Sequence, residues 1–180
     1  MDVLRAVREV DPPSWVAGAG ALRSVVWDRL HDFQQATPIR DVDVAYFDET
    51  DLSRGREDEI VAELCARRPD VPWEVTNQAG VHVWYEAKFG YPIPRLRSVE
   101  EAVGMWPETA TSVAVRLLHD DRVRVVPPRG VDDLLGLVLR RNTRQVSREF
   151  FLQRLREKRI QERGAGLVDT PDPAPDDRRR

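Results

Sequence analysis

Two aspartates, Asp41 and Asp43, carry the clearest chemical signal in this sequence. Polar and apolar residues alternate around them, and this period of two predicts a strand over residues 41–47. Alternate side chains of a strand share a face, so both carboxylates project the same way. Mg²⁺ prefers oxygen ligands and fills its remaining positions with phosphate oxygens or water. The spacing therefore indicates a magnesium site for phosphoryl or nucleotidyl chemistry; the alternative is a strand with one solvated acidic face.

A glycine-bearing turn, Gly18-Ala19-Gly20, comes earlier in the chain and leads into an apolar periodicity typical of an amphipathic helix. Such a turn suits anion binding, because the first amides of a helix are free and phosphate can approach where no Cβ intervenes. Arg23, one turn into that helix, lies within reach of a phosphate. The alternatives are a plain helix-start turn and a solvated arginine.

The elements that must position these residues alternate between helical and extended patterns, with no internal repeat. The apolar periodicity predicts helices over residues 1–12, 22–33, 56–68, 81–90, 98–106, 131–139 and 147–163, the last exposed on most faces. Alternation predicts strands over 41–47 and 73–76 and a hairpin of 112–118 and 122–126. This order predicts an α/β (α+β) domain, with a small mixed sheet flanked by helices.

We expect a single domain over residues 1–163 and a disordered tail over 164–180, where Pro, Asp and Arg cannot bury enough apolar surface to fold. A net charge of −3 argues against a protein that coats nucleic acid by bulk electrostatics, but not against one that binds a nucleotide. With no long apolar segment and no signal segment, we expect a cytoplasmic protein without membrane contacts. The single cysteine, Cys65, is expected to be a buried apolar filler.

Tryptophans and cationic residues each allow two interpretations. The tryptophans in apolar patterns are expected in the core, with base stacking on one of them as the alternative: Trp27, Trp73, Trp84 and Trp106. Four cationic residues are expected on a solvated helix face, with a phosphate-facing edge as the alternative: Arg140, Arg141, Arg154 and Lys158.

Longer motifs extend over most of the chain, from about Trp15 to Lys158. They are Trp15-Val-Ala-Gly18-Ala-Gly20-Ala-Leu-Arg23, Asp41-Val-Asp43-Val-Ala-Tyr46-Phe47-Asp48, Trp73-Glu-Val-Thr-Asn77-Gln78-Ala79, Trp106-Pro107-Glu108-Thr109-Ala110 and Arg141-Asn142. In these motifs the chain resembles an uncharacterised bacterial family of nucleotidyltransferases within the polymerase-beta-like nucleotidyltransferase superfamily. The superfamily pattern is a glycine turn at a helix start, a strand with Asp-x-Asp, and a third carboxylate on a later strand.

The resemblance implies a role for each matching residue. Gly18 and Gly20 would line the triphosphate, while Asp41 and Asp43 would hold Mg²⁺. Glu74, on the predicted strand 73–76, would be the third acid and take the proton of the attacking hydroxyl.

Further contacts follow from the same resemblance. Asn77 and Gln78, at the end of that strand, would contact the nucleotide or the acceptor, or else cap the next helix. Asp48 or Asp51 is the alternative third acid. One departure from the family pattern is Ala19, which interrupts the expected adjacent glycine pair, and another is a longer interval from Gly20 to Asp41.

The implied activity is magnesium-dependent transfer of a nucleoside monophosphate from a nucleoside triphosphate to a hydroxyl acceptor that the sequence does not identify. No nucleic-acid-binding module is recognisable. The alternative is a catalytically inactive nucleotide-binding or protein-interaction module on the same fold. A phosphatase that uses Asp-x-Asp is disfavoured, since Ala45 stands where such a loop has a hydroxyl residue.

Overall fold

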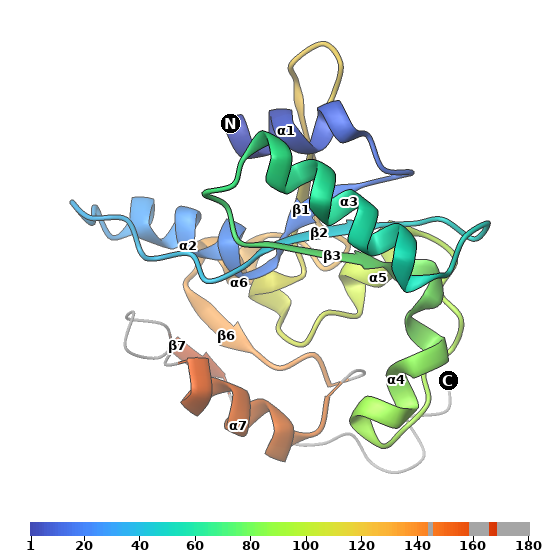
Figure 1. Ribbon diagram of the computed structural model, residues 1–180. Coiled ribbons are helices and arrows are strands. Elements are labelled where there is room, and N and C mark those ends of the chain that lie inside the picture. Colours follow the sequence, from blue (N-terminus) through green and yellow to red (C-terminus); the bar gives the residue numbers. More distant parts are fainter. Residues whose placement is uncertain (144–145, 159–165, 169–180) are drawn as a thin grey trace.

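A five-stranded mixed sheet forms the centre of the protein (Figure 1). The computed structural model describes residues 1–143, 146–158 and 166–168. The strands follow the order β3-β2-β1-β4-β5, where β2 and β3 are parallel and the other neighbours antiparallel. Their bounds are β1 Val16–Gly18, β2 Val42–Tyr46, β3 Trp73–Asn77, β4 Ala114–Leu117 and β5 Val123–Val126. The predicted fold class is confirmed.

Helices surround this sheet at bounds close to the predicted ones in most cases. They are α1 Asp2–Val10, α2 Ala19–Leu30, α3 Arg54–Arg67, α4 Val81–Phe89, α5 Val99–Gly104, α6 Asp132–Leu135 and α7 Arg148–Lys158. Two single-turn 3₁₀ helices, η1 Gln78–Gly80 and η2 Thr109–Thr111, follow β3 and precede β4. No helix in the described ranges is long and apolar enough to cross a membrane.

Three apolar clusters hold these layers together. Helices α1 and α3 cover one face of the sheet, where Val7 and Leu64 pack with Val44 (Figure 1). On the opposite face α5 packs through Val99 and Val103. A third cluster joins α2 and α6 to α7 and consists of buried Trp27, Ala110, Val113, Leu134, Leu139, Val146, Phe151 and Leu155.

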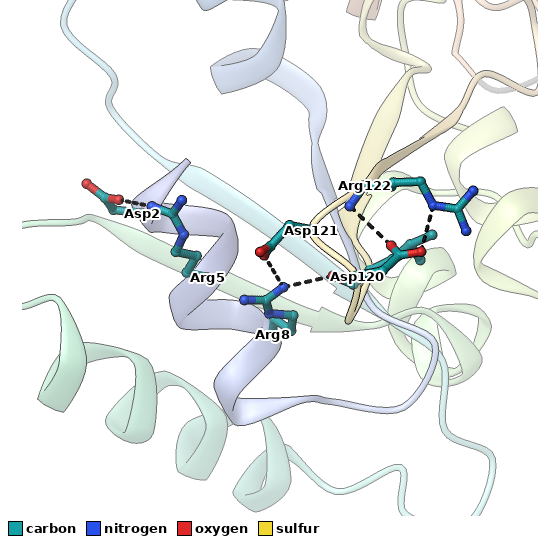
Figure 2. A network of polar contacts seen from close by, with 7 residues as sticks. Asp2, Arg5, Arg8, Asp120, Asp121 and Arg122 are labelled. Atoms are coloured by element: carbon teal, nitrogen blue, oxygen red, sulfur yellow. Dashed lines mark hydrogen bonds and ion pairs between the residues drawn. The ribbon is translucent and has the colours of Figure 1, made fainter.

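Helix α1 is also fixed by polar contacts to the β4–β5 turn (Figure 2). Arg8 Nη1 donates to the Leu118 carbonyl at 2.8 Å and to Asp121 Oδ1 at 2.7 Å. Because the carboxylate of Asp121 accepts from Arg8, its pKa is held below the usual range. The contact holds α1 against the end of the sheet opposite to Gly18 and Asp43.

The structure corrects several expectations from the sequence. Strand β1 was not predicted, since three buried residues are too few to show alternation. The predicted helix 131–139 stops after four residues, where Leu137 adopts a φ of 58°, and the chain continues as β6, Val138–Arg140. Helix α7 is not mostly exposed, because Phe151 and Leu155 are buried. Cys65 is exposed rather than buried.

Part of the expected tail is ordered by pairing. Strand β7, Gly166–Val168, lies parallel to β6 and forms a two-stranded sheet with it. The remaining tail residues, 164–165 and 169–180, lie outside the described residues. The division of the chain at residue 163 stays a prediction.

Candidate active site

Three sequence-predicted residues form one row across the sheet. Gly18 on β1 is the register partner of Asp43 on β2, and Asp43 is in turn the register partner of Glu74 on β3. Register partners on neighbouring strands share a face and lie about 4.8 Å apart. The glycine turn and the two carboxylates therefore meet on one surface, although Gly18 and Glu74 are 56 residues apart in sequence.

A cavity of about 220 Å³ opens over this row. Six of the eight predicted site residues line it: Gly20, Arg23, Asp41, Asp43, Glu74 and Gln78. Asp41 immediately precedes β2 and is not part of the strand. Gly18 itself does not line the cavity. The lining comes from α2, β2, β3, η2 and α7, which lie far apart in the sequence.

The turn Gly18-Ala19-Gly20 shows why glycine is needed at one position and tolerated at another. A Cβ on Gly18 would meet the Val113 carbonyl oxygen at 2.6 Å, so β4 packs against the backbone itself. Among the described residues, a Cβ on Gly20 would meet Asp41 Oδ1 alone, at 3.9 Å, so a methyl group fits there without a clash. Ala19, between them, has a φ of 53°, an unfavourable conformation for a residue with a side chain.

Arg23 is fixed at the rim of the cavity by its own helix. Its side chain is only 5% exposed, and its Cζ lies 5.3 Å from the centroid of the Trp27 ring. Trp27 is itself anchored, since its Nε1 donates to the Leu134 carbonyl at 2.8 Å. A guanidinium is thereby placed beside Gly20 and Asp41 at the start of α2.

Asn77 lies outside the cavity, and its side-chain amide is engaged elsewhere. Its Nδ2 donates to the carbonyls of Asp48 and Asp51, at 2.8 and 2.9 Å. Its Oδ1 accepts from the backbone of Asp48 and of Ala79, each at 3.1 Å. The amide thus ties the loop after β2 to the end of β3 and caps η1; a nucleotide contact by Asn77 stays a prediction.

The two alternative third acids also serve this loop. Asp48 Oδ1 accepts from the Thr50 hydroxyl at 2.6 Å, which holds the pKa of Asp48 below its usual value. Asp51 Oδ1 accepts from the Ser53 backbone at 2.8 Å, and hydrogen bonds from Ser53 lower the pKa of Asp51 in the same way. Neither residue lines the cavity that holds Asp41 and Asp43.

Sequence reasoning missed a buried ion pair on the far wall of the cavity. The Glu108 side chain is 2% exposed and its Oε1 accepts from Arg154 Nε at 3.0 Å. Its Oε2 accepts from Thr111 Oγ1 at 3.0 Å. Nothing in the sequence marks Glu108 as buried. Thr76, which also lines the cavity, could have been predicted, because it follows Glu74 by two residues on one strand and so shares its face.

Of Arg140, Arg141 and Arg154, whose side chains the structure describes, Arg154 lines this cavity. Arg140 instead binds Asp133, with its Nε 2.8 Å from Oδ2. This pair holds the pKa of Asp133 below its usual value. Arg141 is buried and donates to the Val146 carbonyl at 2.8 Å, whereas the Lys158 side chain lies outside the described residues.

Carboxylates are frequent in the described lining of the cavity. Among these residues Glu108 is paired with Arg154, and the carboxylates of Asp41, Asp43 and Glu74 lie on the same cavity as the guanidinium of Arg23. The described residues contain no group of three or more His, Cys, Asp or Glu side chains arranged to hold a metal by themselves. Two carboxylates completed by substrate phosphates are, however, a donor set that Mg²⁺ commonly uses, and Asp41 and Asp43 fit it.

This chain matches a known protein family. The sequence model of a family described as nucleotidyltransferase matches residues 5–168. The chain belongs to this nucleotidyltransferase family. Membership of this family implies a nucleoside triphosphate as the ligand, and the family match spans every residue that lines the cavity. A search of curated protein sequences gives no match.

Two solved structures are similar to this chain to different degrees. One, determined by NMR and described as a CCA-adding enzyme head domain, has 24% identity and a TM-score of 0.75 and covers 93% of this chain and 88% of its own. Another, described as a tRNA-processing enzyme in an apo form, has 16% identity and a TM-score of 0.48; the match covers 92% of this chain and 44% of that chain. The first of these supports the fold.

Proposed function

We propose that this nucleotidyltransferase moves a nucleoside monophosphate from a nucleoside triphosphate to a hydroxyl acceptor, and that it requires Mg²⁺. The observation that carries the proposal is the row Gly18–Asp43–Glu74, with Asp41, Gly20 and Arg23 on the same cavity. The glycine turn, which would bind phosphate, and the acids, which would hold the ion, therefore lie close enough to contact one triphosphate.

The triphosphate is bound from the β1 side. Free amides at the start of α2 and the positive end of its dipole attract phosphate oxygens. The open space at Gly20 lets a phosphate approach the backbone, and the Arg23 guanidinium adds a fixed positive charge beside it. Because Arg23 is packed on Trp27, little side-chain freedom is lost when it binds phosphate.

Asp41 and Asp43 are the residues that would hold Mg²⁺. When bound, the ion neutralises charge on the triphosphate and stabilises the oxygens of the displacement. Both carboxylates lie on the cavity wall, so they need no conformational change to face the phosphates.

The reaction is a substitution at the α-phosphorus. The acceptor oxygen forms a bond to that phosphorus, and the bond from the phosphorus to the bridging oxygen breaks, so pyrophosphate leaves with the bonding electrons. The hydroxyl proton passes to Glu74, which is exposed and lies beside Asp43 on the neighbouring strand. Orientation and charge stabilisation supply most of the rate, as in other phosphoryl transfers.

Release of labelled pyrophosphate tests the proposal. Each labelled triphosphate is incubated with Mg²⁺, the protein and a heat-treated cell extract as the acceptor source. Wild type should release pyrophosphate, and Asp41→Ala/Asp43→Ala should not. Asp58→Ala, an exposed acid on α3, is the matched control and should keep the wild-type rate. Equal release by wild type and the double variant would show that the acids are wrongly assigned.

Ala19 favours one other candidate, an inactive nucleotide-binding module. A side chain in the left-handed region, between the two glycines, sits where the phosphate turn should be most open. Calorimetric binding of a triphosphate by wild type, with no pyrophosphate released under any condition, would identify that module.

A further inference from the structure

The edge of the sheet beyond Glu74 holds a second cavity, of about 420 Å³. This volume falls in the range of small-molecule sites. The cavity shares Glu74 and Thr76 with the first, so the two adjoin at β3. Its other lining residues come from α3, β3 and α4: Arg54, Glu57, Val75, Trp84, Ala87 and Lys88.

The geometry of the reaction predicts that the acceptor approaches from the side of this cavity. In phosphoryl transfer the attacking and leaving oxygens lie roughly in line, on opposite sides of the phosphorus. Pyrophosphate over Gly20 and Arg23 leaves on the β1 side of the row. The attacking hydroxyl must then arrive from the β3 side, past Glu74, which is the side on which the second cavity opens.

Trp84 gives this cavity a surface for an aromatic ring. The sequence suggested a core position, but the residue is 36% exposed. The next residue, Tyr85, is buried and packs on Phe89 with ring centroids 4.4 Å apart, which fixes the helix turn that presents Trp84. Lys88 Nζ lies 5.3 Å from the Trp84 ring centroid, so a cation accompanies the ring.

Charges in the cavity suit a ring that carries phosphates. Arg54 extends from the start of α3 with its side chain 87% exposed, and its Nη1 lies 3.8 Å from Glu57 Oε2. Glu57 is itself held, because its Oε1 accepts from the Asn77 backbone at 2.7 Å. Aromatic side chains with cations beside them are what proteins use to bind single-stranded nucleic acid without sequence preference, and Trp84 has Lys88 and Arg54 in the same cavity.

We infer that the second cavity is the acceptor subsite and that the acceptor is the end of a single-stranded nucleic acid. Its terminal hydroxyl reaches Glu74, a base stacks on Trp84, and backbone phosphates meet Lys88 and Arg54. The inference rests on the proposed function and extends it, since it names the class of acceptor. The net charge of −3 does not oppose it, because only the terminal nucleotides are bound.

Binding of a fluorescein-labelled hexa-adenylate tests this inference in 50 mM salt, by anisotropy. Trp84→Ala should weaken the affinity about 5- to 150-fold, as expected when one stacked base is lost. Trp84→Phe should restore most of it. Val83→Ala, a more exposed apolar neighbour on the same helix, should bind like wild type. Arg54→Gln should reduce the slope of log affinity against log salt by about 0.7, the value for one phosphate contact.

Calorimetry with ATP and Mg²⁺ on the same variants separates this inference from the proposed function. ATP affinity should not change in Trp84→Ala. A fall would mean that the cavity holds the base of the donor, and the inference would be wrong. It would also be wrong if hexa-adenylate failed to bind, or bound independently of Trp84, while ATP still bound. Failure of wild type to bind any of the four nucleoside triphosphates would instead refute the proposed function.

Discussion

Asp43 and Glu74 are neighbours in register on the parallel strands β2 and β3, so two carboxylates project from one face of the sheet about 4.8 Å apart at the backbone. Like charges at this spacing repel, and a bound cation would relieve that repulsion. Asp43 also has Gly18, on the neighbouring strand β1, as its register partner. The acids therefore lie between the glycine turn on one side and the β3 edge of the sheet on the other.

Glu74→Gln should lower the rate of transfer about 100-fold, because the amide cannot take the hydroxyl proton. Triphosphate affinity should stay at the wild-type value, since Glu74 lies on the acceptor side of the row. Single-turnover rates and calorimetric affinities measure the two effects separately. A loss of affinity that matched the loss of rate would place Glu74 among the residues that bind the donor.

Gly18→Ala and Gly20→Ala should have opposite effects. The first forces a Cβ to 2.6 Å from the Val113 carbonyl and should reduce the free energy of unfolding by roughly 1–3 kcal/mol. The second adds a methyl group in open space within α2 and should leave stability unchanged or raise it by up to about 1 kcal/mol, while weakening triphosphate binding. Urea unfolding and calorimetry test both. Equal destabilisation by the two changes would contradict the contacts described at the turn.

Arg154→Ala should destabilise the protein by about 3 kcal/mol, because it leaves the Glu108 carboxylate buried without its ion-pair partner. Arg156→Ala, an exposed arginine on the same helix, is the control and should change stability by no more than about 0.5 kcal/mol. Chemical unfolding monitored by tryptophan fluorescence measures both. Similar small effects would show that α7 is held by its apolar contacts alone.

Asp133 makes stability depend on acid pH. Its folded-state pKa is depressed below 3.8, chiefly by Arg140, so around pH 4 the unfolded state binds more protons than the native state. The stabilising contribution is complete above the unfolded pKa and is lost as pH falls through the folded one. The melting temperature should fall less steeply between about pH 5 and 3 in Asp133→Asn than in wild type. Asp132→Asn, its exposed neighbour, should follow the wild-type curve.

Features that depend on nearby residues in the chain could be predicted from the sequence. Alternation identified the Asp41–Asp43 spacing, and six of the eight proposed site residues line one cavity. The fold class followed from the order of helical and extended patterns. Such inferences succeed where a pattern repeats within a few residues of the side chain concerned.

Features that depend on tertiary contacts could not be predicted from the sequence. Strand β1 is only three residues long and takes its extended form from pairing with β2 and β4. Glu108 is buried because Arg154, 46 residues away, approaches it. The exposure of Trp84 depends on how α4 packs, which its apolar neighbours in sequence do not reveal.

A crystal structure with Mg²⁺ and a non-hydrolysable triphosphate would show directly how the donor is bound. We expect the ion on carboxylate oxygens of Asp41 and Asp43, phosphates beside Gly20 and Arg23, and the β3 side of the α-phosphorus left open toward Glu74. A triphosphate bound elsewhere, or an ion without contact to either aspartate, would contradict this expectation.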